Sequence, residues 1–211
     1  MTIELKVDFT PVINDIARVL STASVEIQKR ATYNALNYVG DKARTKVRKH
    51  VANQTSAKYG AVVKYITTTH RAHPNSLRYE IGAKGPAMPL TAFKIKGRAG
   101  DRKFQVFAWN EWKTYGGSAF LMRFKSGGQL VPVKRVAPHT WSGKHGYSPA
   151  KKRLAGMGGH IRQLWGPIIP KEMLRDGKET KRYLETVVPY EFVPRLEHEI
   201  AQAMIRAAKG K

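Results

Sequence analysis

Few residues of this 211-residue sequence have the types and spacing that catalysis requires. His198-Glu199 begins like the zinc-binding string of a metalloprotease, but the fourth position after His198 is Gln202 instead of a second histidine. The paired imidazole ligands of that string are therefore missing, which favours a surface pair on an amphipathic helix. Three more histidines have neither Cys nor carboxylate near them in sequence: His139, His145 and His160.

Carboxylates are equally sparse where a catalytic site would need them. Between Lys42 and Lys171 the only acids are Glu80, Asp101 and Glu111, and no spacing brings two of them together. Metal-dependent nucleases hold their ions with clustered carboxylates, so this chemistry is not supported. The chain has no cysteine, which removes thiolate nucleophiles and disulfides. We therefore expect a protein that is not an enzyme and that uses no metal or other cofactor.

The chain's positive charge is concentrated in its middle. The segment from Lys42 to Lys171 holds 26 Lys and Arg against three acids, which accounts for the whole formal net charge of +23. The two flanks hold equal numbers of basic and acidic residues. A field of one sign destabilises a compact chain through self-repulsion, so this bias indicates a polyanionic or acidic partner.

Residues 137–160 form the most unusual segment of this basic region. They contain five glycines, three histidines and no acid, which predicts a long loop. Basic and aromatic side chains alternate there, as in loops that contact phosphates and stack on bases. Contact with phosphates and contact with protein alone both stay open. The candidate residues for contact with DNA or a partner are Lys134, Arg135, Trp141, Lys144, Lys151, Lys152 and Arg153.

A long amphipathic helix precedes this region. Thr10-Pro11 reads as an N-cap with proline in the first turn, and apolar residues then recur every three to four positions to about residue 51. Such a helix would be about 57 Å long, so it either breaks near Ser21–Ser24 or projects onto another subunit. We favour a slight kink combined with assembly. The candidate subunit contacts are Arg44, Arg48 and Lys49, although such a basic face is often only solvated.

The rest of the sequence predicts strands followed by two helices. Residues 2–9 alternate between apolar and polar, as in a half-buried strand. We expect helices over about 171–187 and from about Pro194 to the end. Together these elements predict one α+β domain over residues 1–211. In it, a long N-terminal helix and C-terminal helices pack on a mainly antiparallel β-sheet that carries the basic loop. Further strands are expected over 66–70, 77–83, 90–96, 103–109, 119–124 and 129–136.

We find no signal peptide and no membrane-spanning segment in the sequence. The N-terminal residues lack the basic and apolar regions of a signal peptide, and no apolar run approaches the roughly 18 residues of a membrane span. We expect synthesis in the cytosol and no membrane partner.

Several short segments recur in the order found in a known family. They are Ala35-Leu36-Asn37, Asp41–Arg48, Pro89–Lys94, Ala119-Phe120-Leu121, Ser126-Gly127, Ile161–Pro167 and Arg195–Ile200. In this order they resemble the minor tail protein Z family of tailed bacteriophages, also called tail completion proteins. The sequence departs from that family mainly in residues 136–160.

The resemblance implies a non-enzymatic virion protein at the head-proximal end of the tail, forming a homo-oligomeric and most simply hexameric ring. Its expected partners are the tail terminator, tail tube, tape-measure and neck proteins, with double-stranded DNA in the lumen. The alternative is a non-specific nucleic-acid-binding protein that acts outside a virion, which the charge alone would explain.

Overall fold

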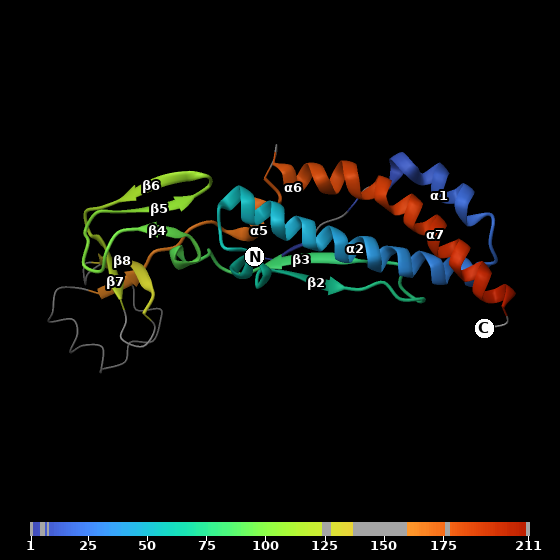
Figure 1. Ribbon diagram of the computed structural model, residues 1–211, viewed down its shortest axis with the longest axis horizontal. Helices are drawn as coiled ribbons and strands as arrows, with labels where there is room; N and C mark the ends of the chain where they lie inside the picture. The colour runs from blue at the N-terminus through green and yellow to red at the C-terminus, as the bar shows by residue number, and fades with distance from the viewer. Residues whose placement is uncertain are drawn as a thin grey trace. The chain divides into compact units, whose positions relative to one another are not determined.

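The computed structural model describes residues 2–4, 7, 9–123, 128–136, 160–175 and 178–209. By their contacts these residues form two compact units. Unit 1 combines 1–54, 59–86 and 168–211, and unit 2 combines 55–58 and 87–167. Helices in the terminal regions and antiparallel sheets confirm the predicted α+β class (Figure 1). A single domain stays a prediction, and residues 137–159 of the predicted loop lie outside the described residues.

The N-terminal helix of unit 1 breaks where the sequence is weakly helical. A 3₁₀ turn, Thr10–Val12, leads into α1 (Ile13–Leu20), and α2 (Val25–Thr55) follows. At the break, the Gln28 side-chain amide donates to the carbonyls of Leu20 and Ala23 at 2.9 and 2.8 Å. The favoured slight kink is wrong, because the two helices run in opposite directions (Figure 1). Polar side chains satisfy the carbonyls that the helix end leaves free.

Helix α2 contributes a long row of buried side chains to the core of unit 1. Its buried side chains recur at every fourth position, which places them on one face of the helix. A glycine at position 40 is required because a Cβ there would lie 2.4 Å from the ring of Tyr79. Small side chains therefore let the neighbouring sheet approach α2 closely. The buried stripe is Ala31, Ala35, Val39, Ala43, Val47 and Val51.

The sheet of unit 1 has three antiparallel strands in the order β1-β3-β2. β2 (Ile66–His70) lies where the sequence predicts it, whereas β3 (Glu80–Lys84) begins three residues later than predicted. β1 (Thr2–Glu4) lies within the first predicted strand, of which residues 2–4, 7 and 9 are described. The short helix α3 (Tyr59–Val63) leads into β2.

The C-terminal region is helical but is divided differently from the prediction. The predicted helix over 171–187 is three pieces: α5 (Ile169–Met173), α6 (Glu179–Arg182) and a π-helical turn (Tyr183–Val187). α7 (Val188–Ala208) then continues through Pro194 instead of starting there. Leu196 and Ile200 of this helix are buried, whereas Met204 is 46 % exposed. None of the helices within the described ranges is long and apolar enough to cross a membrane.

Unit 2 contains two three-stranded antiparallel sheets. One has the order β4 (Lys94–Lys96), β5 (Phe104–Ala108), β6 (Glu111–Tyr115). The other has the order β7 (Ala119–Arg123), β8 (Leu130–Val136), β9 (His160–Gln163). A 3₁₀ turn, Leu90–Ala92, replaces the first half of the strand predicted over 90–96. The buried side chains of this unit include Met88, Leu90, Phe93, Phe104, Val106 and Leu121.

Candidate nucleic-acid interface

The two units differ in how much charge of each sign they contain. In sequence, unit 2 holds 16 Lys and Arg but only two acids, Asp101 and Glu111. Unit 1 holds 22 Lys and Arg together with 13 acids. The carboxylate of Asp101 already accepts a hydrogen bond from the backbone N–H of Arg98 at 2.6 Å. Unit 2 therefore has far fewer carboxylates to balance its cations than unit 1 has, and its positive field is stronger.

Cations of unit 2 lie over aromatic rings. The Nζ of Lys96 is 4.0 Å from the centroid of the Trp112 ring, and the Nζ of Lys113 is 4.1 Å from that of Trp109. The electron-rich face of an aromatic ring attracts a cation by about 0.5–1 kcal/mol at an exposed site. This interaction holds the ammonium groups at the surface without neutralising them.

The outer face of the β4-β5-β6 sheet carries one of these pairs, Lys96 and Trp112. On β5, Phe104, Val106 and Ala108 are buried, so Gln105 and Phe107 point to the opposite, outer side. The pairing register sets two rows of side chains across this outer side, because directly opposed residues share a face. One row is Lys94, Phe107 and Trp112, and the other is Lys96, Gln105 and Thr114. These six residues are called the basic-aromatic face below.

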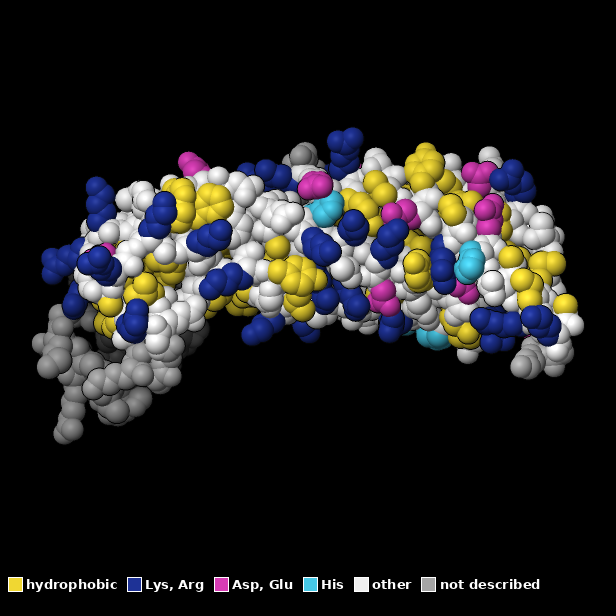
Figure 2. Space-filling view, viewed as in Figure 1, with side chains coloured by type: hydrophobic (Ala, Val, Ile, Leu, Met, Phe, Trp, Pro, Cys, Tyr) yellow, Lys and Arg dark blue, Asp and Glu magenta, His cyan; other side chains and the backbone are white. Residues whose placement is uncertain are grey.

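The two rings of the basic-aromatic face are neighbours. Their centroids are 5.1 Å apart with the ring planes inclined by 50°. In the second row, the amide of Gln105 donates to the hydroxyl of Thr114 at 3.3 Å. Figure 2 shows yellow side chains among dark blue Lys and Arg over this sheet. The face therefore combines exposed cations, aromatic surface and polar groups, and it contains no acid.

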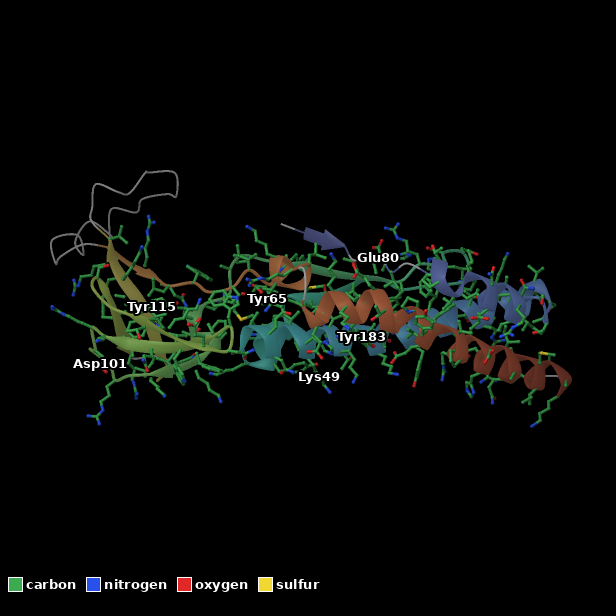
Figure 3. All side chains as sticks on the ribbon, turned by 90° about the horizontal axis from the view of Figure 1, so that it is seen from above. Lys49, Tyr65, Glu80, Asp101, Tyr115 and Tyr183 are labelled. Atoms are coloured by element: carbon green, nitrogen blue, oxygen red, sulfur yellow. The ribbon has the colours of Figure 1, made fainter. Side chains whose placement is uncertain are left out.

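The opposite face anchors this sheet to the core of unit 2. The ring of Tyr115 stacks on that of Phe104 with centroids 5.4 Å apart and planes only 9° from parallel. Burial raises the pKa of the phenol of Tyr115, whose side chain is labelled in Figure 3. Packing on one side thus leaves only the other side of the sheet for a partner.

A tight turn sets the register that brings Phe107 and Trp112 together. Trp109 and Asn110 have φ values of 56° and 61°, the conformation of a two-residue type I′ hairpin turn. The backbone N–H of Trp109 donates to the carbonyl of Thr55 at 3.0 Å, and that of Asn110 donates to the hydroxyl of Ser56 at 2.8 Å. Positive φ is unusual for tryptophan, so these contacts hold a conformation that the sequence alone disfavours.

Two of the predicted contact residues lie on β8. Lys134 and Arg135 are both exposed, and as neighbours on a strand they point to opposite faces. Their contact with DNA or a partner stays a prediction. Arg135 lies over the ring of Phe120, 5.3 Å from its centroid. Lys134 lies directly opposite Arg162 of β9. Like charges in this position repel, which an anion would relieve. The other candidates lie outside the described residues: Trp141, Lys144, Lys151, Lys152 and Arg153.

Two of the three predicted subunit-contact residues have partners inside unit 1. Arg48 donates from Nε to the carbonyl oxygen of Ile66 at 2.9 Å, and its Nη2 reaches the same oxygen. Arg44 donates to the hydroxyl of Thr68 at 2.6 Å. Both side chains therefore fasten α2 to β2, a role that the sequence analysis missed. Lys49 is exposed on the same helix, and its contact with another subunit stays a prediction (Figure 3).

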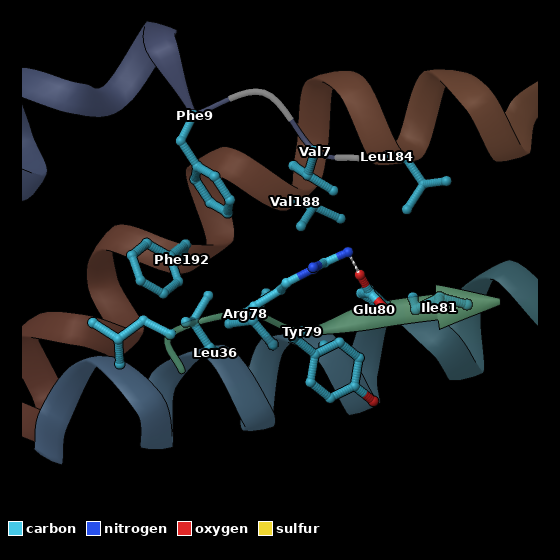
Figure 4. Close-up of a pocket in the computed structure, with 14 residues that line it drawn as sticks. Val7, Phe9, Leu36, Arg78, Tyr79, Glu80, Ile81, Leu184, Val188 and Phe192 are labelled. Carbon is cyan, nitrogen blue, oxygen red and sulfur yellow. Dashed lines mark ion pairs between the residues drawn. The ribbon is translucent and has the colours of Figure 1, made fainter. Parts of the chain in front are cut away.

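Unit 1 contains a cavity of about 530 Å³ between α2, β3 and α7 (Figure 4). Its lining is mainly aliphatic and aromatic, with an ion pair between Arg78 and Glu80. The phenol of Tyr79 donates to Asp41 at 2.7 Å, so its hydrogen-bonding capacity is used within the unit. This lining presents no pair of groups arranged for catalysis.

Sequence reasoning missed the basic-aromatic face because it missed β6. The alternation of 104–108 was visible, but the turn lacks the Asn-Gly or Asp-Gly signal of a tight hairpin. The pattern Lys94-Ile95-Lys96 was a usable signal, since two lysines in alternation mark one exposed strand face.

Comparisons of this chain with known proteins found no match among protein-family models, curated proteins or solved structures. In the part of the chain that the structure describes, no group of three or more His, Asp and Glu could hold a metal ion.

Proposed function

We propose that this chain is a structural protein of a bacteriophage virion, of the tail completion class, whose basic unit 2 faces nucleic acid. The observation that carries the proposal is the charge of unit 2 combined with its exposed basic-aromatic face. The ordered short segments supply the class, since they resemble tail completion proteins.

Passage of DNA requires weak contacts with phosphates that do not depend on the base sequence. Lysine ammonium groups on flexible stems make such contacts, and their strength falls steeply with salt. Lys94, Lys96, Lys134 and Arg162 are exposed cations on two sheets of unit 2. A ring of subunits would repeat this set around a lumen and add the contributions of many weak contacts.

Assembly into a ring, most simply of six subunits, needs a surface on unit 1. The beginning of α2 and the end of α7 leave large apolar side chains in solvent: Val25, Met204 and Ile205 are between 46 and 65 % exposed. Apolar surface of this kind supports contact between subunits or with tail terminator, tube, tape-measure or neck proteins.

Particles produced without this protein test the proposal. We expect separate heads and tails in electron micrographs, because the tail would lack the part that joins the head. Wild-type protein supplied in trans should restore joining, whereas a Leu196→Asp variant with a disrupted core should not. Normal head joining in the absence of the protein would contradict the proposal.

A nucleic-acid-binding protein acting outside a virion is the second candidate. The rings of Phe107 and Trp112 favour it, because stacking contributes to binding by an isolated protein. It predicts tight, salt-sensitive binding to nucleic acid by the purified chain and no co-purification with tails. Incorporation into virions, found by mass spectrometry of purified particles, would decide against it.

A further inference from the structure

We infer that the basic-aromatic face binds single-stranded nucleic acid, with unpaired bases stacked on Trp112 and Phe107 and phosphates held by Lys94 and Lys96. This inference rests on the proposed contact of unit 2 with nucleic acid, but it does not need assembly into a tail. It specifies the form of the partner, which the net charge alone leaves open.

The rings are placed for stacking. Phe107 and Trp112 stand directly opposite each other on neighbouring strands, with centroids 5.1 Å apart. Both side chains are only partly buried, although nothing in the core requires aromatic residues on the outer side of the sheet. Each base stacked on an aromatic side chain contributes measurably and with little sequence preference, since every base has a π-face.

The cations are placed beside the rings and not among acids. Lys94 opposes Phe107 in the pairing register, and the Nζ of Lys96 lies 4.0 Å from the centroid of Trp112. A base that stacks on this ring replaces the ammonium group. The flexible stem of Lys96 then allows the charge to move to a neighbouring phosphate. The attraction between Lys96 and the ring thus keeps a cation next to the stacking surface until a base arrives.

The remaining side chains of the face disfavour readout of one sequence. The amide of Gln105 and the hydroxyl of Thr114 bond to each other at 3.3 Å and are both at the surface. Neither is held by buried partners in the way that a base-specific site requires. Binding should therefore tolerate different bases.

Stacking on Trp112 distinguishes single-stranded nucleic acid from other polyanions that a basic sheet attracts, because only a single strand offers unpaired bases. In a duplex the bases are already stacked on each other, so Trp112 has no base to receive. An acidic polypeptide also lacks bases. Both would use only Lys94 and Lys96, and their affinity would be insensitive to Trp112.

The test measures binding of the full chain to three probes by fluorescence anisotropy. The probes are an oligo-dT of about twelve nucleotides, a duplex of the same length and polyglutamate. We expect Trp112→Leu to weaken oligo-dT binding roughly 5- to 150-fold, which corresponds to about 1–3 kcal/mol per base. Its affinity for the duplex and for polyglutamate should change less than twofold.

Trp165→Leu is the matched control. This tryptophan also belongs to unit 2 and is 53 % exposed, but it lies outside the basic-aromatic face. It should leave oligo-dT binding within twofold of the wild type. Equal losses for all three probes, no loss for any probe, or equal losses in the two tryptophan variants would overturn the inference.

Cross-linking keeps the inference testable if Trp112→Leu does not fold. An oligonucleotide carrying iodouracil, bound to the wild-type chain and irradiated, joins covalently to aromatic rings that it contacts. We expect the cross-linked peptide to contain Phe107 or Trp112. Cross-links confined to other peptides would overturn the inference. Neither measurement depends on heads joining tails, so failure of the proposed virion function would be recognised separately.

Discussion

Arg48 on α2 and Lys96 on β4 show how differently the two units use positive charge. The guanidinium of Arg48 donates to the carbonyl oxygen of Ile66 and so ties a helix to a strand of its own unit. The ammonium of Lys96 lies over Trp112 on an exposed sheet face. Arg48 thus stabilises the fold of unit 1, whereas Lys96 places its charge on the surface of unit 2. The net charge of a sequence does not distinguish these two uses.

Ion pairs are a second way in which unit 1 uses its positive charge within the fold. In unit 1 the Nζ of Lys42 is 3.1 Å from Glu191, Arg44 is 3.1 Å from Asp41, and Arg195 pairs with Glu199. Partly exposed pairs of this kind each contribute at most about 1 kcal/mol. Together with the other acids of unit 1 they reduce its positive field, since 13 acids oppose 22 Lys and Arg there, whereas two acids oppose 16 in unit 2.

The largest expected effect concerns the packing of unit 1. Leu196 is fully buried on α7, so Leu196→Ala should lower the free energy of unfolding by about 2–5 kcal/mol through lost contacts and a cavity. Met204→Ala on the same helix is the control and should cost less than about 1 kcal/mol, because Met204 is 46 % exposed. Urea unfolding followed by circular dichroism measures both. Similar losses would contradict the placement of the core.

Two substitutions, one in each unit, show whether the cations of unit 1 contribute more to folding than those of unit 2. Arg48→Met should destabilise the chain by about 1.5–3 kcal/mol, because it leaves the carbonyl of Ile66 without a charged donor. Lys96→Met should cost no more than about 1 kcal/mol, since it removes only an exposed cation–aromatic contact. Urea midpoints at constant slope report both changes. A larger loss for Lys96→Met would mean that unit 2 also uses its cations for folding.

The smallest expected effect is the dependence on alkaline pH. Burial, together with the nearby Glu191 carboxylate, raises the pKa of Tyr183 from 10.0 to about 12. Between these values the unfolded chain has lost a proton that the folded chain keeps, so the free energy of unfolding falls as the pH rises. After allowance for solvent screening, we expect Tyr183 to contribute on the order of 1 kcal/mol to this fall.

Two phenylalanine variants isolate that contribution. Tyr183→Phe removes the titrating group and should flatten the decline in thermal midpoint above pH 10, whereas Tyr190→Phe, at a residue that is 62 % exposed, should not. An unchanged decline in Tyr183→Phe would show that other groups, such as the phenol of Tyr79, dominate the alkaline loss.

The sequence predicted elements that local patterns determine. β2 occupies the predicted residues, and β8 begins one residue after its predicted start, because both segments are rich in the β-branched side chains that strands favour. A break near Ser21–Ser24 was one of two alternatives that the sequence left open, but a slight kink was favoured and the reversal of the chain was not predicted. That reversal depends on the packing of α1 against α7, whose residues are far away in sequence.

Other contacts between distant segments were not predicted either, because local sequence patterns do not show which distant residues meet. Gln54 donates from Nε2 to the carbonyl of Glu172 at 2.6 Å and thereby joins α2 to α5 across more than 100 residues. The basic-aromatic face arises from a turn whose tryptophan adopts positive φ, a conformation that no propensity favours. A pattern of lysines can suggest such a face, but only the register of β4, β5 and β6 assembles it.

One measurement tests most directly whether unit 2 is the partner-binding unit. The double variant Lys94→Gln/Lys96→Gln is compared with Lys46→Gln/Lys49→Gln, which removes two exposed lysines from α2 of unit 1. We predict that the unit 2 variant binds oligo-dT at least tenfold more weakly and lowers the salt dependence by about 1.4 in logarithmic slope. The unit 1 variant should stay within about threefold of the wild type, because only long-range screened charge is lost. Equal losses in the two variants would contradict the account.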